Sequence, residues 1–451
     1  MVLARGAAAV AAAYVPGGTS QAEIIRSGPT KARPPIAMYG VVPFLFGRRG
    51  WRSVEARLDH LTDLGVDTLW LSPVTPTATG GFGYDPISYA HPRRDYGSEA
   101  EFRRMIEAIH DHGMRVILDF PTDDTSDRHP YFLDALRRGR RSPYYDYYQR
   151  DARGRPVHYF DWTNLPNLNF DNAAARDWIT SVYCHWLTDY GVDGFRMDAA
   201  WGVRHRTPRF WPECIAAIRR ISPDALLIAE GSALDPYYGK AGFDCVYDWS
   251  HRVGHWAWAG AFEHPGRTAE SLAPDLAATE NLPISVLRFL DDNDTGARFL
   301  TRHGLAVTKL GATLLFSLEG LPAIYAGDDV GAEYKPYETE GPIDWTGRHG
   351  LFFHYRRLIA LRGSRPALRE GVRSGASASP GPGVLVFRRD AGAESILAAF
   401  NFARRPSHLT LAADELDVPP VDLLSGRVIP MSRNGRVEIP ANGALLLADC
   451  P

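Results

Sequence analysis

The sequence predicts an α/β fold: a (β/α)8 TIM barrel with a small subdomain inserted after strand 3, followed by a C-terminal antiparallel β-sandwich domain. Short apolar runs alternate with helical periods from about residue 35 to about residue 365. A polar, tyrosine-rich segment interrupts this alternation once, and the helical period disappears after Arg365. Eight strand candidates favour a closed barrel, because open doubly wound sheets more often have about five or six strands.

The predicted barrel strands are short apolar runs, each separated from the next by a helical or irregular segment. They cover residues 36–42, 66–72, 115–120, 192–198, 225–230, 243–248, 284–290 and 322–327. Neighbouring parallel strands need a crossover connection that is usually a helix, so this alternation indicates parallel pairing.

Apolar residues at helical spacing predict the helices between these strands. The first helical segment shows this spacing at Val54, Leu58, Leu61 and Leu64. In the segment 98–113, Ser98 is a suitable N-cap and Gly113 a suitable terminator. Further helices are expected at 174–191 and near 303–318 and 350–362.

The chain is expected to divide into four parts. Residues 1–34 form a flexible N-terminal tail, 35–120 and 171–365 the barrel, 121–170 the inserted subdomain B, and 366–451 the C-terminal β-sandwich. An irregular loop of about fifty residues is improbable, so the insertion is expected to fold over the barrel mouth. Its aromatic residues form either a sugar platform or the subdomain's own core: Tyr144, Tyr145, Tyr147, Tyr148, Tyr159, Phe160 and Trp162.

Composition narrows the possible functions. The 451 residues include 50 basic and 53 acidic side chains, without a Lys/Arg run, which argues against a nucleic-acid partner. The four cysteines are far apart, which predicts reduced thiols and no metal site. No segment has the length of a membrane span. The short Ala-rich N-terminus is a poor secretory signal, so a cytoplasmic enzyme is favoured and secretion is left open.

Acidic residues end four of the apolar runs. Asp119, Asp198 and Glu230 each close a run, and the fourth is followed by the cluster Asp291–Asp294. The C-terminal ends of barrel strands open on one face, so these acids are expected to meet in one pocket. The alternative for any single acid is a helix cap or an ion pair with an arginine, but four such acids on one face favour a catalytic site.

The chemistry that this set of acids suits is cleavage of a glycosidic bond. Two carboxylates about 5 Å apart permit retention, in which one attacks the anomeric carbon and the other protonates the leaving oxygen. A third acid can stabilise the oxocarbenium-like transition state. Arg196 lies two residues before Asp198, on the same side of its strand, where it can hold a nucleophile ionised.

Several segments resemble motifs of the α-amylase family of glycoside hydrolases. "GVDGFRMDAA", "LLIAEG" and "FLDDNDT" resemble the nucleophile, general-acid and third-acid segments. "GFGYDPISY" followed by "YGS", "VILDFPTDDTSDRHPYF", "LPNLNFDN" and "GLPAIYAGDDVG" resemble four further motifs of the family. They occur in the family's order, and the resemblance covers residues 36–451 roughly.

The resemblance implies a role for each matching residue. It implies Asp198 as nucleophile, Glu230 as acid/base and Asp294 as transition-state stabiliser. It also implies that Arg196 orients Asp198, that Tyr84 stacks on the reacting sugar, and that Asp119 is a structural acid beneath the site. The expected substrate-binding residues are Tyr84, Asp85, Arg196, Asp124, Asn293 and Trp201.

Two departures from the family pattern alter the expected sugar subsite. Asp123 and Asp124 stand where the family usually has Asn-His, and Asn293 stands where it has the histidine before Asp294. Two donors to sugar hydroxyls are therefore missing. The reacting sugar could carry a different hydroxyl pattern or a cationic group, an ordinary glucosyl unit could be bound by other contacts, or activity could have been lost.

Other features carry weaker expectations. Trp249, Trp256 and Trp258 follow the sixth strand, where they could line the acceptor side, and His129 and His158 are expected to be structural. Asp123 is a weak candidate calcium ligand, and otherwise no metal is expected. No glycine-rich phosphate loop is present, so no cofactor is expected.

The leading functional hypothesis is a retaining glycoside hydrolase acting on α-linked glucosides or short α-gluco-oligosaccharides. A transglycosylase that uses the same covalent intermediate, and a non-catalytic carbohydrate-binding protein, are the alternatives. The expected partner is a small carbohydrate, with no nucleic acid and no membrane, and the oligomeric state is left open.

Overall fold

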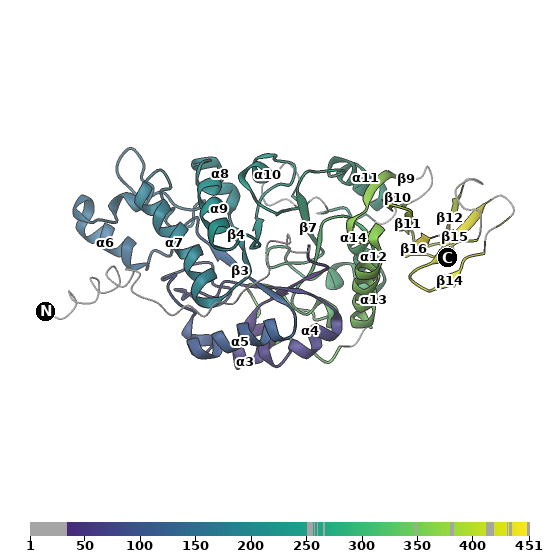
Figure 1. Ribbon diagram of the computed structural model, residues 1–451, viewed down its shortest axis with the longest axis horizontal. Coiled ribbons are helices and arrows are strands. Elements are labelled where there is room, and N and C mark those ends of the chain that lie inside the picture. The colour runs from purple at the N-terminus through teal and green to yellow at the C-terminus, as the bar shows by residue number, and fades with distance from the viewer. Residues whose placement is uncertain are drawn as a thin grey trace. The chain divides into compact units, whose positions relative to one another are not determined.

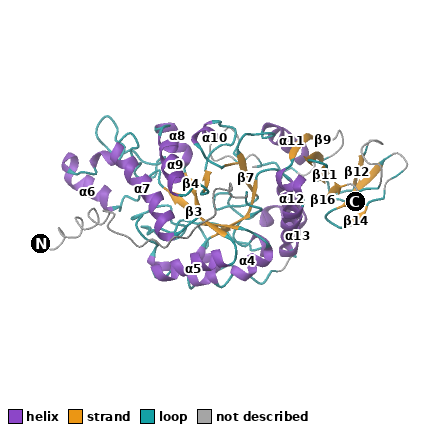
Figure 2. Ribbon diagram, in the orientation of Figure 1, coloured by secondary structure: helices purple, strands orange, loops and turns teal. Residues whose placement is uncertain are grey.

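The computed structural model describes residues 34–249, 256, 258, 260–264, 267–347, 350–378, 383–411, 419–430, 432 and 435–448. The predicted tail 1–34 and Cys450 therefore lie almost entirely outside the described residues. Strands β1 to β8 form a closed barrel in chain order, and every pair in it is parallel. The strands lie inside a ring of helices (Figures 1 and 2). The predicted TIM barrel is confirmed.

Each barrel strand coincides with one of the predicted apolar runs. The strands are β1 (Met38–Val41), β2 (Thr68–Leu71), β3 (Arg115–Pro121), β4 (Gly194–Asp198), β5 (Leu226–Ala229), β6 (Cys245–Tyr247), β7 (Ser285–Phe289) and β8 (Leu321–Ile324). Nearly all their residues are buried. Strands buried on both faces read as continuous apolar runs, which is why the sequence locates them well.

Helices surround the barrel and fill the connections. They are α2 (Pro43–Phe46), α3 (Trp51–Glu55), α4 (Leu58–Leu64), α5 (Glu99–Asp111), α7 (Ala173–Tyr190), α8 (Ala200–Arg206), α9 (Phe210–Ile221), α10 (Tyr237–Ala241), α11 (Thr268–Ala278), α12 (Phe299–Ser317) and α13 (Leu351–Ser364). The predicted N-cap Ser98 forms a full capping box with Glu101.

Two helices differ from their predicted extent. The first helical segment divides into α3 and α4, because the Ala56 N–H closes α3 onto the Arg52 and Val54 carbonyls. Helix α12 starts at Phe299, before the expected 303, because the carboxylate of Asp291 accepts the Phe299 N–H at 2.8 and 2.9 Å. A kink at Gly304, with φ of 77°, follows this first turn.

The inserted segment contains α6 (Pro130–Arg138), two short 3-10 turns and a set of isolated β-bridges. Part of its aromatic set builds a small core, since Tyr148 is buried and Tyr144 stacks on Tyr131 at 3.7 Å. Phe160 and Trp162 are instead exposed, by 64% and 58%. The aromatic residues therefore divide between a core and a surface.

The C-terminal region is antiparallel, as predicted. After α14 (Pro366–Glu370), a six-stranded sheet has the order β14-β13-β16-β11-β10-β9, and β12 pairs with β15 in a second sheet. The strands are β9 (Val372–Ala378), β10 (Val384–Ala391), β11 (Glu394–Asn401), β12 (Ser407–Thr410), β13 (Val421–Asp422), β14 (Arg427–Val428), β15 (Arg436–Ile439) and β16 (Gly443–Ala448). Val437 and Ile439 of the small sheet share a core with Leu445 and Leu447.

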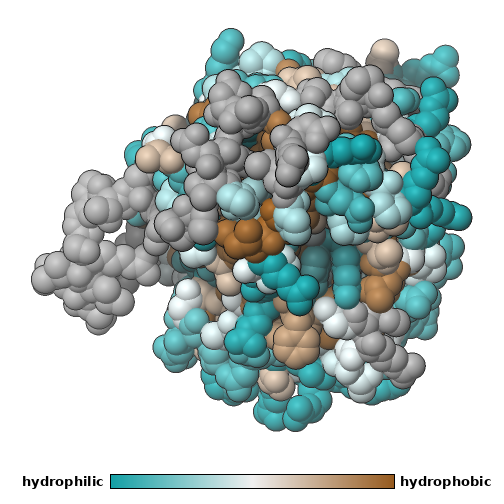
Figure 3. Space-filling view, turned by 90° about the vertical axis from the view of Figure 1, so that its right-hand side faces the viewer, coloured by the Kyte–Doolittle hydropathy of each residue, from teal (hydrophilic) through white to brown (hydrophobic). Residues whose placement is uncertain are grey.

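Side chains of mixed polarity cover this end of the molecule. On the side viewed in Figure 3, hydrophilic residues predominate and hydrophobic residues form small patches between them. Scattered surface apolar groups of this kind are ordinary and do not indicate a docking face.

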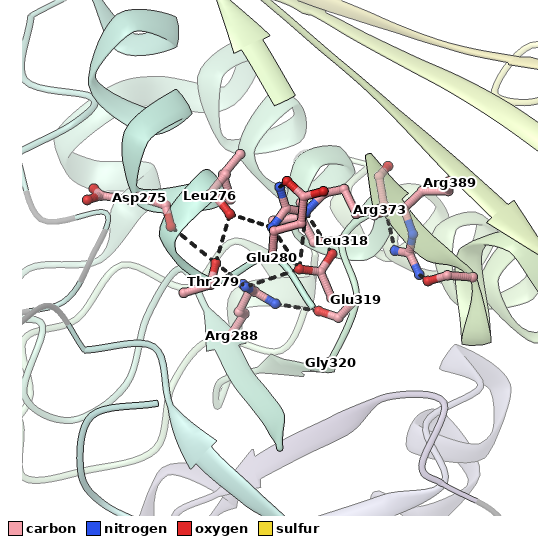
Figure 4. A network of polar contacts seen from close by, with 12 residues as sticks. Asp275, Leu276, Thr279, Glu280, Arg288, Leu318, Glu319, Gly320, Arg373 and Arg389 are labelled. Carbon is pink, nitrogen blue, oxygen red and sulfur yellow. Dashed lines mark hydrogen bonds and ion pairs between the residues drawn. The ribbon is translucent and has the colours of Figure 1, made fainter. Parts of the chain in front are cut away.

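A buried arginine network joins the barrel to this sheet (Figure 4). The carboxylate of Glu319, just before β8, accepts hydrogen bonds from Arg373 of β9 at 2.9 Å and lies 3.7 Å from Arg288 of β7. Arg389 of β10 donates to the carbonyl of Ser317 at 2.7 Å. Because Arg288, Arg373 and Arg389 are buried, the network depends on the few acids and carbonyls that face it.

Candidate active site

Arg196 of β4 lies at the centre of the predicted acid cluster. It is fully buried, and strand register places it beside Asp119 of β3. Its Nη1 contacts Asp119 at 2.8 Å and also contacts Asp198, while Nη2 lies 3.1 Å from Glu230. One guanidinium therefore contacts three carboxylates from three strand ends, as parallel barrel geometry allows.

Tyr247, at the end of β6, is a member of this cluster that was not predicted. Its hydroxyl accepts a hydrogen bond from Arg196 Nε at 2.8 Å. Its position at the end of the predicted strand 243–248 was the available signal, but an uncharged residue there does not stand out. The contact fixes the plane of the guanidinium.

Among the described residues, Arg196 is the positive charge that contacts these acids. Burial is the largest influence on Asp119 and raises the pKa of that carboxyl to about 7, with Arg196 opposing it. Burial, together with the negative charges of Asp198 and Asp294, also raises the pKa of Glu230 well above its usual range despite Arg196. Glu230 is therefore suited to hold a proton near neutral pH.

The turn between β4 and α8 holds Glu230 in place. The Ala199 N–H donates to Glu230 Oε2 at 2.6 Å, and the Trp201 N–H donates to the Glu230 carbonyl at 3.2 Å. Ala199 has a positive φ of 45°, which is unfavourable for a residue with a Cβ. The residue after Asp198 is thus strained where it meets Glu230, as often occurs at functional sites.

The three clustered acids after β7 have different environments. Asp291 is buried and caps α12 through the Phe299 N–H. Asp292 is buried and folds the turn by accepting from Asp294 N and Thr295 N at 2.8 and 3.0 Å. Asp294 is the exposed member of the three. Two of the acids therefore hold the backbone that presents the third.

Tyr84 and Asp85 form one wall of the site. The Tyr84 hydroxyl donates to Asp119 Oδ2 at 2.8 Å, and the buried Asp85 carboxylate accepts a hydrogen bond from the Thr77 hydroxyl. A cavity of about 640 Å³ lies along this wall. Its lining includes Phe44, Phe82, Tyr84, Trp162, Tyr337 and Glu340. It is large enough for a sugar, with rings that can stack on one.

Asp123 and Asp124 lie side by side at the end of β3, and both are buried. Arg206 of α8 forms an ion pair with Asp123, while Asp124 Oδ1 is without a hydrogen-bond partner in the described structure. Burial raises the pKa of Asp123 to about 6, and raises that of Asp124 well above its usual range. Arg206 was not identified from the sequence, because helix α8 brings it to Asp123 from 83 residues away.

Asp123 does not fit the weak calcium prediction. Calcium needs about six to eight oxygen ligands, whereas a guanidinium already neutralises this carboxylate. The described residues contain no group of three or more His, Cys, Asp or Glu side chains that could hold a metal ion.

Exposed aromatic rings approach the site from the inserted subdomain. The ring centroid of Phe160 lies 5.7 Å from that of Trp201, and the ring centroid of Tyr159 lies 6.1 Å from it. Trp201 is half-buried on the helix that directly follows Asp198. Trp162, on the same segment, lines the cavity beside Tyr84. The segment 159–162 thus contributes aromatic rings both beside Trp201 and to the cavity beside Tyr84.

The remaining predicted residues are more peripheral. Trp256 and Trp258 line a second cavity of about 230 Å³ that reaches Asp294, whereas Trp249 is buried. His129 caps α6 by accepting from Tyr131 N at 3.2 Å, and burial lowers its pKa to about 3. His158 lies in an isolated bridge with Pro166. Within the described residues, each helix is too short or too polar to cross a membrane.

Comparison with known proteins gives related sequences. Alpha-amylase MalA of Haloarcula japonica is 29% identical over 384 residues, which cover 83% of this chain and 55% of that protein. The 4-alpha-glucanotransferase of Thermotoga maritima is 30% identical over 333 residues, covering 66% and 72%. The chain thus spans little more than half the length of the first relative.

Solved structures share the fold. The type III pullulan hydrolase from Thermococcus kodakarensis has a TM-score of 0.75 at 27% identity, covering 88% of this chain and 71% of that one. An alpha-amylase from Geobacillus thermoleovorans has a TM-score of 0.76 at 21% identity, covering 91% and 97%, which shows the fold alone.

The family assignment follows from a match that covers most of the barrel. The family described as "Alpha amylase, catalytic domain" matches residues 47–346, which include every barrel strand except β1 and all of the acids around Arg196. The chain therefore belongs to the α-amylase family of glycosidases.

Proposed function

We propose that this chain cleaves α-linked glucosides or short α-gluco-oligosaccharides with retention of configuration. Asp198 is the nucleophile, Glu230 the general acid and base, and Asp294 the transition-state stabiliser. The observation that carries the proposal is the pair of contacts from one guanidinium, Arg196, to both Asp198 and Glu230. Two carboxyl groups held on one guanidinium are close together, which suits a double displacement better than attack by an intervening water.

The reaction has two steps. A carboxylate oxygen of Asp198 bonds to the anomeric carbon while the glycosidic C–O bond breaks and the leaving oxygen takes the Glu230 proton. A water or a sugar hydroxyl then gives a proton to Glu230 and bonds to the same carbon, which releases Asp198. Arg196 contacts the Asp198 carboxylate, while burial keeps Glu230 protonated before the first step.

The substrate class rests on the relatives. Proteins named 4-alpha-glucanotransferase, cyclomaltodextrinase and neopullulanase are 26–31% identical to this chain over 65–87% of its length. Their names denote α-linked glucose polymers and rings. The cavity beside Tyr84 supplies room for the glucosyl units on the glycone side.

We also infer that Asp124 contacts the reacting sugar as a neutral carboxylic acid. It is buried, its neighbour Asp123 takes Arg206, and Asp124 Oδ1 has no partner in the described structure. A buried carboxyl without a cation is more stable when protonated, and it then donates a hydrogen bond as a histidine N–H does. An ordinary glucosyl unit is therefore bound in spite of the missing histidines.

The pH dependence tests this inference against a cationic sugar. A neutral Asp124 loses its donor as pH rises through its raised pKa, so Asp124→Asn should retain binding of a maltoside at high pH better than the parental protein. A site for an amino sugar would behave in the opposite way, since its attraction for the cation would increase with pH. Inhibition constants for maltose and glucosamine from pH 5 to about 7, where the amine is still protonated, distinguish the two.

Transfer to a sugar acceptor is the second candidate, and the Phe160–Trp201 pair favours it. Exposed rings that approach the helix after the nucleophile can stack on an acceptor sugar and so compete with water. Phe160→Ala should therefore lower the ratio of transfer products to free glucose by about fivefold and leave total substrate consumption within about twofold. An unchanged ratio would remove the reason for preferring transfer.

Incubation with maltooligosaccharides, followed by chromatography, tests the activity itself. Free glucose or maltose indicates hydrolysis, and longer products indicate transfer. Asp198→Asn should abolish turnover while leaving the circular dichroism spectrum unchanged, and Asp189→Asn, at a surface ion pair with His185, should have no effect. Near-parental turnover by Asp198→Asn would refute the nucleophile, and binding without any product would support the non-catalytic alternative.

A further inference from the structure

The loop after β8 places one tyrosine in an unfavourable backbone conformation at the edge of the site. Residues 335–338 form a turn closed by a hydrogen bond from Glu338 N to Lys335 O at 3.3 Å. Pro336 occupies the second position and Tyr337 the third, with φ of 64°. This combination is typical of a type II turn, whose third position usually holds glycine. A bulky side chain kept at such a position suggests that the side chain itself is needed.

The ring of Tyr337 forms part of the cavity wall. It lies 4.7 Å from the ring of Phe82, which is buried in the turn that carries Tyr84. The same cavity is lined by Tyr84 and Tyr337, although Tyr337 remains 57% exposed. The ring is therefore held on one side and open to the site on the other.

The hydroxyl of Tyr337 connects two residues of the third-acid segment. It accepts from Asn293 Nδ2 at 2.6 Å and donates to Asp294 Oδ1 at 3.0 Å. Tyr325, at the end of β8, donates to Asn293 Oδ1 at 3.4 Å. Each residue in this series donates a hydrogen bond to the next, from Tyr325 to Asn293, from Asn293 to Tyr337 and from Tyr337 to the Asp294 carboxylate.

We propose that Tyr337 is a positioning residue that orients the Asp294 carboxylate, through a hydrogen bond to Oδ1 that leaves Oδ2 for the reacting sugar. Asn293 stands where the family usually has a histidine, and its side chain is directed to the Tyr337 hydroxyl rather than toward a sugar. Tyr337 thereby supplies, from another loop, the fixed donor beside Asp294. The role rests on the proposed function, in which Asp294 stabilises the transition state.

The electrostatics agree with a donor that favours the ionised acid. Although Asp294 reaches solvent, desolvation by the surrounding protein is the largest influence on its pKa and raises it, whereas the hydrogen bond from Tyr337 acts to lower it. Desolvation and the adjacent Asp294 charge raise the pKa of Tyr337 well above its usual range, so the phenol keeps its proton. Removal of the hydroxyl should therefore make Asp294 a weaker acid.

Tyr337→Phe removes the hydroxyl and keeps the ring. We expect kcat and kcat/KM to fall together by about tenfold with KM within about twofold, because the lost contact acts on the transition state. The acidic limb of the kcat/KM profile should move up by roughly one pH unit. Tyr337→Ala should show the same loss of kcat with a several-fold higher KM, because the wall is also lost. Tyr334→Phe is the matched control, since its hydroxyl contacts Arg298.

A second measurement separates this role from the proposed activity. In protein labelled with carboxyl carbon-13 aspartate, with Asp294→Asn used for assignment, Tyr337→Phe should raise the Asp294 pKa without any substrate. Normal turnover and an unmoved Asp294 pKa in Tyr337→Phe would overturn the positioning role alone. A moved pKa in a parental protein that turns over no α-glucoside would instead overturn the proposed function, and the catalytic meaning of Tyr337 with it.

Discussion

Glu319→Gln offers a strong test of how the barrel and the C-terminal sheet are held together. The change keeps the size of the side chain and removes its charge. The Glu319 carboxylate accepts three bonds from Arg373 and lies 3.7 Å from Arg288 (Figure 4). The side chains of both arginines are at most 2% exposed, so removal of the acid leaves buried cations without their shared partner.

The magnitude can be obtained in two ways. Loss of one partner of a buried ion pair costs about 3–5 kcal/mol. Burial opposes ionisation of Glu319, but the neighbouring arginines outweigh it and lower the pKa from an ordinary 4.5 to about 2. At roughly 1.4 kcal/mol for each pKa unit, this shift gives about 3.5 kcal/mol. Arg288 keeps Asp248 at 3.0 Å, and Arg373 keeps Glu280 at 4.0 Å, which favours the lower end of the range.

The sign of the pH dependence follows from the lowered pKa. The contribution of Glu319 to the free energy of unfolding is fully present above its unfolded pKa of about 4.5 and is lost as pH falls toward about 2. The gap between the parental protein and Glu319→Gln should therefore be about 3 kcal/mol at pH 7 and should shrink below pH 4.

Urea unfolding followed by tryptophan fluorescence and by circular dichroism provides the assay, because agreement of the two probes checks for a single transition. Glu55→Gln is the control, since Glu55 pairs with Arg104 at 3.2 Å on the surface and should matter by less than about 1 kcal/mol. If Glu319→Gln destabilised no more than this control at pH 7, or by a pH-independent amount, the account of the network would be refuted.

Three further changes test the site. Glu230→Gln should lower kcat on maltosides at least about a hundredfold and remove the alkaline limb of the pH profile, since activity needs a proton that Glu230 loses as pH rises. If the alkaline limb of kcat/KM persisted in this variant, the limb would belong to another group. Arg206→Met should leave the buried Asp123 unpaired and lower Tm by several degrees at pH 8, but by less at pH 5, where a carboxyl with a pKa of about 6 is protonated. An equal decrease of Tm at the two pH values, measured by calorimetry, would contradict the pairing. Trp162→Ala should raise KM for maltotriose about fivefold with kcat nearly unchanged, and a steady-state assay in which kcat falls instead would place Trp162 at the reacting sugar.

The sequence predicts the barrel well because its signals are local. Strands buried on both faces leave continuous apolar runs, and Ser98 with Glu101 leaves a cap pattern that the structure reproduces. Helix α12 was predicted to start too late because the N–H of its first residue, Phe299, is bound by Asp291, an acid that the pattern assigned to the site rather than to the helix.

The gathering of three acids around Arg196 could be predicted because each acid lies at the end of a strand. Arg196 contacts the three acids at the ends of β3, β4 and β5, which the alternation of strands places on one face. Tyr337 and Arg206 could not be predicted in the same way, because neither lies at a strand end. The positive φ of Tyr337 has no sequence signal either, since a proline followed by tyrosine fits many turns.

The shared guanidinium of Arg196 also has a consequence for inhibitors. With Arg196 as the cation that contacts Asp119, Asp198 and Glu230 among the described residues, the site retains protons that an incoming positive group can displace. Capture of an amine-bearing sugar mimic should therefore release protons to the buffer, and its heat of association should vary with the buffer's own ionisation heat. The acid cluster thus exchanges protons for the positive charge of a ligand.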